Sequence, residues 1–152
     1  MIERLLLIAA VILPVVCSAV SVRDGSGRVV GNVSNQGNRT IYRDGSGRVT
    51  GTSQQTGNTT LFRDGSGRVK GTSTQVGGTT VYRDSSGRTQ GTARQVGNQV
   101  IFRDASGRIT GTATSTGNRT IYRDSSGRVQ GSADKVLPSP DKTIYGLKKR
   151  KK

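Results

Sequence analysis

The pair Arg-Asp recurs every twenty residues through the middle of the chain, and this period limits the possible folds more than any other feature. The pair appears first at Arg23-Asp24, returns at Arg43-Asp44, and reaches its sixth copy at Arg123-Asp124 without a change in spacing. A fixed period of this length is typical of repeat arrays, in which each copy is one supersecondary unit that packs on its neighbours. We therefore expect six equivalent units.

Each Asp is followed by a small residue and then by Ser-Gly-Arg, as in Asp44 to Arg48. This pattern predicts a tight turn in which the carboxylate accepts backbone N–H groups and the glycine adopts a positive φ. We assign these structural turn roles to Asp24, Gly27, Asp44, Gly47, Asp64, Gly67, Asp84, Gly87, Asp104, Gly107, Asp124 and Gly127.

A second turn signal lies midway between the Asp turns. Gly-Asn stands at Gly37-Asn38 and recurs in later copies, with Gly77-Gly78 as a variant, and such pairs between extended segments favour two-residue hairpin turns. The segments between the turns, such as Thr40-Ile41-Tyr42, are rich in β-branched and aromatic residues that favour strands. Turns therefore alternate with short strands.

The predicted fold class is all-β, with six 20-residue β-hairpin repeats that form a continuous antiparallel sheet. Counting back from the Asp turn pairs Tyr42 with Val49 and Thr40 with Gly51, which would place the ring diagonally over a glycine. The alternative is a two-sided β-solenoid, in which Arg43 would stack directly over Arg63 at the spacing of strands. Hairpins are favoured because both turns have hairpin chemistry.

The two ends of the chain differ from the repeats. Arg4 followed by an apolar run and small residues up to Ala19 is typical of a secretory signal peptide. The predicted organisation is a signal peptide at 1–19, a six-copy β repeat array at 20–133, a Pro-containing loop and closing strand at 134–147, and a basic tail at 148–152. Thr143-Ile144-Tyr145 repeats the strand phrase and is expected to protect the edge of the sheet.

The N-terminal segment has two other interpretations. Cys17 would be the lipidated first residue of a lipoprotein, or the apolar segment would stay uncleaved as an anchor reaching Val22. Cleavage after Ala19 would remove the single cysteine, and because Glu3 and Arg4 would leave together the net charge would stay at +15.

The phrase "GNTTLFRDGSGRVKG" resembles the YD repeat of the bacterial RHS family, with Tyr42, Asp44, Gly47, Arg48 and Val49 as the matching residues in one copy. The resemblance implies hairpins in a spiralling sheet. An arginine stands where that family has a tyrosine before the Asp, and the chain is too short for the family's enclosing shell and has no toxin domain, so encapsulation is not expected. The twenty-residue spacing is also similar to choline-binding repeats, but the chain has no Trp for an aromatic cage.

The residue types argue against an enzyme. The chain has no histidine, and the aspartates of the repeats occupy one identical turn position, whereas an active site needs a single special place. A metal site is not expected either, because arginines flank each Asp in place of the dense carboxylates of a calcium loop. We expect no cofactor.

The net charge of +15 directs attention to anionic partners. The two arginines around each turn would form a ladder of positive charge that either keeps the sheet soluble or binds anionic polymers through many weak contacts. The basic tail would hold anionic lipid headgroups or act as a solubilising tail. The candidate anion-binding residues are Arg23, Arg28, Arg43, Arg48, Arg63, Arg68, Arg83, Arg88, Arg103, Arg108, Arg123, Arg128, Lys148, Lys149, Arg150, Lys151 and Lys152.

The sequence thus predicts an exported bacterial protein of the periplasm, cell surface or extracellular space. It would act as a non-enzymatic binding or structural element that holds anionic glycans or lipids and touches a membrane only peripherally. Nucleic acid is not an expected partner, because the signal peptide points to export. The alternative is a subunit of a self-assembling extracellular β-fibre, since the composition is similar to that of curli-class fibres.

Overall fold

The computed structural model describes residues 19–134, and every regular element in this range is a β-strand. Six strands precede an Asp turn: β1 (Ala19–Asp24), β3 (Arg39–Asp44), β5 (Thr59–Asp64), β7 (Thr79–Asp84), β9 (Gln99–Asp104) and β11 (Arg119–Asp124). Six follow one: β2 (Val29–Gln36), β4 (Val49–Thr56), β6 (Val69–Val76), β8 (Thr89–Val96), β10 (Ile109–Thr116) and β12 (Val129–Asp134).

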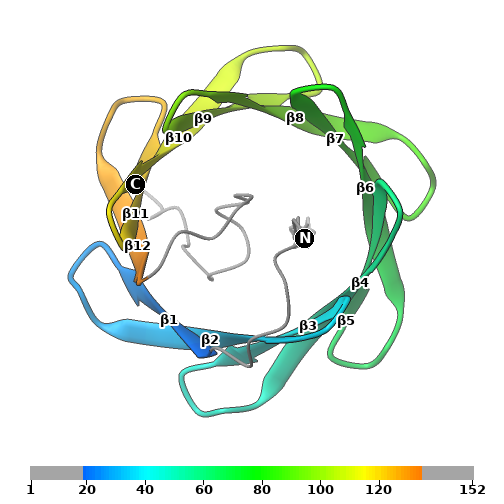
Figure 1. Cartoon of the computed structure of the whole chain (residues 1–152), viewed down its shortest axis with the longest axis horizontal. Helices are drawn as coiled ribbons and strands as arrows, with labels where there is room; N and C mark the ends of the chain where they lie inside the picture. Colours follow the sequence, from blue (N-terminus) through cyan, green and yellow to red (C-terminus); the bar gives the residue numbers. More distant parts are fainter. Residues whose placement is uncertain (1–18, 135–152) are drawn as a thin grey trace, which may run out of the picture.

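The twelve strands form one continuous antiparallel sheet, which confirms the predicted fold class. Each strand pairs with the next in the chain, and β12 pairs with β1, so the sheet closes into a barrel (Figure 1). The solenoid alternative is wrong, because a solenoid stacks parallel strands from successive copies, whereas every neighbouring pair here is antiparallel.

Closure changes how the sheet protects its edges. We expected Thr143-Ile144-Tyr145 to cover a free edge, but that segment lies outside the described residues, and the edges of β1 and β12 pair with each other. An anchor helix reaching Val22 does not fit, because Ala19 to Val22 belong to β1. The remainder of the proposed leader also lies outside the described range.

The register within each repeat differs from the predicted one. Tyr42 lies opposite Gly51, and Arg43 lies opposite Val49. Two features move the pairing: the Asp turn has three loop residues between Asp44 and Arg48, and the register shifts between Tyr42 and Arg43 because of a bulge on the facing strand. The predicted pairings of Tyr42 with Val49 and of Thr40 with Gly51 are therefore wrong: Tyr42 lies opposite Gly51, and Thr40 lies opposite Ser53.

The core is one narrow layer on a single face of the sheet. In the third strand Tyr42 and Thr40 are buried, and in the fourth Gly51 and Ser53 are buried, whereas the residues between them are more exposed. Because side chains on one face of a closed barrel point into its interior, this buried row faces the lumen. The row combines large and small residues: Tyr42, Phe62, Tyr82, Phe102 and Tyr122 alternate with Ser53, Ser73, Ala93, Ala113 and Ala133.

The glycine that recurs in each second strand has a backbone role. A Cβ built on Gly51 would lie 2.7 Å from the carbonyl oxygen of Arg63 on the next repeat. The same contact with a neighbouring carbonyl would arise at Gly31 and Gly91, where Arg43 and Arg103 supply the oxygen. Adjacent repeats therefore approach too closely at these positions for any side chain.

The Asp turn provides a matched test of the glycine requirement. Gly47 has a φ of 84°, which costs an alanine about 1–2 kcal/mol, so Gly47→Ala should lower the free energy of unfolding by that amount in urea titrations. Gly45→Ala is the control, because its Cβ would make an ordinary 3.5 Å contact with the Val29 carbonyl oxygen and alanine already stands at the equivalent position 105. Equal effects of the two substitutions would contradict the assigned backbone geometry.

Candidate anion-binding rim

The six Asp turns lie at one end of the barrel, because each joins an odd-numbered strand to the next even-numbered strand. Figure 1 shows these turns spreading outward from the ring, as seen in the blue turn between β1 and β2 and the orange turn between β11 and β12. We call this end the Asp rim. The shorter Gly-Asn turns, in which Gln36 pairs directly with Arg39, lie at the opposite end.

The Asp turn is held by its own backbone and by the carboxylate. In the first copy the amide of Gly27 donates to the Asp24 carbonyl at 3.0 Å, and the amide of Asp24 donates to the Arg28 carbonyl at 2.9 Å. The Asp24 carboxylate oxygen Oδ1 accepts the amides of Ser26 and Arg28 at 2.9 and 3.0 Å. This is a three-residue hairpin loop, with glycine in the left-handed region.

The first arginine of each repeat is tied to its own turn. The Arg43 guanidinium donates from Nη1 to the carbonyl oxygen of Gly47 at 2.9 Å. The same bond is made by Arg23, Arg63, Arg83, Arg103 and Arg123, at 2.8 to 3.2 Å. These guanidinium groups brace the turn and keep their remaining N–H groups for other contacts.

The second arginine of each repeat is placed differently. Its backbone amide completes the turn, but within residues 19–134 its guanidinium makes no hydrogen bond or ion pair. All six of these residues are exposed. They are Arg28, Arg48, Arg68, Arg88, Arg108 and Arg128.

A third position on the rim was missed in the sequence. In three of the six repeats the residue two places after the second arginine reaches back to the other carboxylate oxygen, Oδ2, of the turn Asp. Lys70 Nζ lies 3.8 Å from Asp64, Gln90 donates to Asp84 at 2.9 Å, and Gln130 donates to Asp124 at 2.8 Å. This contact depends on the bulge, and a bulge has no distinct residue signature in these strands.

Hydrogen bonding favours the ionised form of Asp24, Asp44 and Asp104 on the rim. The hydroxyl of Ser46 is the main cause of a pKa for Asp44 below its usual value, and the amides of Arg48 and Ser46 add to the effect. Asp24 and Asp104 have pKa values lowered in the same way, with Ser26 and Ser106 as the hydroxyl donors. Two arginines and one ionised aspartate give each turn a net positive charge.

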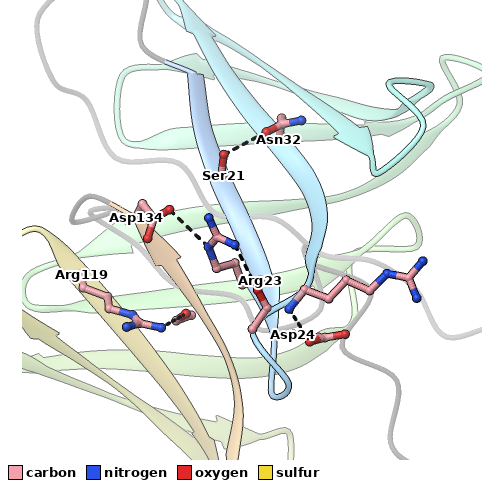
Figure 2. A network of polar contacts seen from close by, with 9 residues as sticks. Ser21, Arg23, Asp24, Asn32, Arg119 and Asp134 are labelled. Atoms are coloured by element: carbon pink, nitrogen blue, oxygen red, sulfur yellow. Dashed lines mark hydrogen bonds and ion pairs between the residues drawn. The ribbon is translucent and has the colours of Figure 1, made fainter.

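The opposite end carries much less positive charge. Arg39, Arg94 and Arg119 are the basic residues near the Gly-Asn turns, compared with the twelve arginines and one lysine of the Asp rim. Arg119 is also engaged, because it donates to the Ser132 hydroxyl at 2.9 Å (Figure 2). The described barrel is therefore strongly asymmetric in charge along its axis.

The structure brings the predicted arginines of the repeats together at one rim but says nothing of the rest of the predicted site. Lys148, Lys149, Arg150, Lys151 and Lys152 lie outside the described residues. In residues 19–134 no group of three or more His, Cys, Asp or Glu side chains gathers to hold a metal ion. Over the same range no helix is long and apolar enough to cross a membrane.

No protein-family model matches this chain, and a search of the curated proteins finds no match. The candidate site therefore depends on its geometry and charge.

The hydrogen-bonded carboxylates of the turns predict that the free energy of unfolding depends on pH. Because the folded pKa values of Asp24, Asp44 and Asp104 are lowered, their contribution is complete above about pH 4, the unfolded value, and is lost as the pH falls through the folded values. Urea titrations should therefore show a falling free energy of unfolding below about pH 4.

The variant Asp44→Asn separates this effect from general acid denaturation. An asparagine side-chain oxygen still accepts the amides of the turn but does not titrate, so the variant should lose stability less steeply with acid than the native chain. Identical pH profiles for the two proteins would refute the role given to the Asp44 carboxylate.

Proposed function

We propose that this chain is an exported, non-enzymatic binding element that holds anionic polymers or lipid headgroups through the arginines of its Asp rim. One observation carries the proposal: six exposed guanidinium groups, which make no hydrogen bond or ion pair within residues 19–134, stand on six equivalent turns at one end of a closed barrel. Arginine forms paired hydrogen bonds with carboxylate and phosphate groups, which suits it to this role.

The repetition supports a polyvalent mode of binding. A single exposed arginine binds an anion weakly, because water and salt screen the charge. Equivalent turns on one closed ring let an extended polyanion or a lipid surface engage several arginines together, and each further contact is then intramolecular. The affinity would arise from the number of contacts.

The turns carry the argument against catalysis. The six Asp turns share the same backbone hydrogen bonds, and each carboxylate accepts amides of its own loop. A general base or nucleophile needs one position whose environment differs from the others. We therefore place the function in binding.

The proposed location follows from the leader segment. Export to the periplasm, cell surface or extracellular space rests on the signal-like residues 1–19. Anionic envelope polymers and lipid headgroups are the partners that such a location would offer.

Removing charge from the rim should weaken binding more than removing it from the other end. The double variant Arg48→Gln with Arg88→Gln should lose about 30-fold in affinity for a sulfated polysaccharide or for anionic vesicles at low salt, at about 1 kcal/mol for each arginine. Isothermal titration calorimetry measures the first probe, and vesicle co-sedimentation measures the second.

The control is Arg39→Gln with Arg94→Gln, which removes the same charge from the opposite end and should change the affinity by less than about threefold. Equal losses for the two double variants would show that net charge alone governs binding. A native protein that binds neither probe at low salt would end the proposal.

The alternative function is a subunit of a self-assembling β-fibre. The closed barrel weakens it as a direct route, because in residues 19–134 every strand has a neighbour on both sides. Salt distinguishes the two functions: anion binding should fade steeply as salt rises, whereas assembly should persist or increase once charge repulsion is screened. On one preparation, light scattering measures assembly, and the binding measurements described above measure anion binding.

A further inference from the structure

The junction between the first and last strands repeats the junction between neighbouring repeats. Gly31 lies opposite Asp44 where β2 meets β3, and Gly131 lies opposite Asp24 where β12 meets β1. We call the β12–β1 junction the seam. Its register is therefore the one used at every contact between repeats.

The seam is the one junction in the described barrel that has no covalent turn. The other junctions between repeats are joined by a Gly-Asn or Gly-Gly turn and pair six residues with six, as from Gly31–Asp44 to Gln36–Arg39. Within residues 19–134 the seam pairs Val22 with Ala133, Arg23 with Ser132, and Asp24 with Gly131.

The seam also buries a smaller side chain than the other junctions do. At the other junctions the residue equivalent to Val22 is a buried aromatic, such as Phe62 opposite Ser53. The seam also has an ion pair at 3.6 Å between Arg23 and Asp134, whose side chains are 38% and 51% exposed (Figure 2). An exposed pair of this kind adds little to stability.

We propose that the barrel opens at the seam and that a second copy of this chain then pairs its β1 with the exposed β12. The two edges are complementary to each other: Gly131 leaves room beside Asp24, Ala133 faces Val22, and Asp134 meets Arg23. Since no covalent turn fixes which copy supplies β1, the same register is available between two chains as within one.

The arrangement is head-to-tail. The β12 edge of one copy fits the β1 edge of the next, so each added copy presents a new β12 edge, and such contacts produce rings when they close and filaments when they do not. This inference deepens the assembly alternative and does not depend on anion binding. The experiment uses no polyanion, so the two proposals fail separately.

The test mixes two single-cysteine proteins in a Cys17→Ser background. Val22→Cys and Ala133→Cys place thiols opposite each other only when β1 of one copy lies against β12 of another, because within each chain the facing residue is native. The mixture, treated with a short thiol crosslinker at increasing protein concentration, should yield a covalent heterodimer, and neither protein alone should yield a comparable homodimer.

The matched control mixes Val20→Cys with Val33→Cys, two buried valines that face each other across the β1–β2 hairpin. The seam mixture should give at least about tenfold more heterodimer, which corresponds to about 1.4 kcal/mol in favour of opening there. Equal yields from the two mixtures, or heterodimer from neither, would overturn the proposal.

Hydrogen exchange on the native chain supplies a measurement that needs no substitution. The amides of β1 and β12 that pair across the seam should exchange faster than the paired amides of β6 and β7, because exchange reports local opening. Equal protection of the two sets would overturn the proposal even if a cysteine variant failed to fold.

Discussion

Hydrogen bonding between the backbones of neighbouring strands is the interaction on which this protein depends. The buried layer is thin, and several of its members are polar, such as Thr40, Ser53 and Thr60. Tyr42 and Ser53 satisfy each other through a 3.1 Å bond between their hydroxyl oxygens. Because so little apolar surface is available, a continuous ladder without free edges replaces much of the stabilisation that a deep core provides elsewhere.

Two features support these backbone hydrogen bonds: the close approach of neighbouring strands and the shape of the Asp turns. Gly51 lets the Arg63 carbonyl of the next repeat come near, and the Asp44 carboxylate orders the loop from which the next strand starts. The bulge after each turn restores the alternation of buried and exposed residues. It also brings Lys70, Gln90 and Gln130 back over their own aspartates. The positive rim is thus a product of the same turns that hold the fold.

Much of this architecture could be predicted from the residues, because it is local. The positive φ of Gly47 and the two-residue turn at Gly37-Asn38 follow from the chemistry of a few adjacent residues. The closure of the sheet could not be predicted, since it depends on the accumulated twist of all twelve strands. The predicted register was wrong for a similar reason. The three-residue loop and the bulge each displaced the partner of Tyr42, and a bulge leaves no clear mark in the sequence. For the rim, the sequence identified the arginines but could not separate Arg43, which braces its turn, from Arg48, which does not.

The equality of the repeats has a consequence for how such a chain changes over generations. Recombination between two copies would add or delete one whole sector of twenty residues and leave every remaining joint in register. Such an event would change the diameter of the barrel and its number of guanidinium groups in the same step. The size of the barrel and its number of exposed arginines would therefore change together.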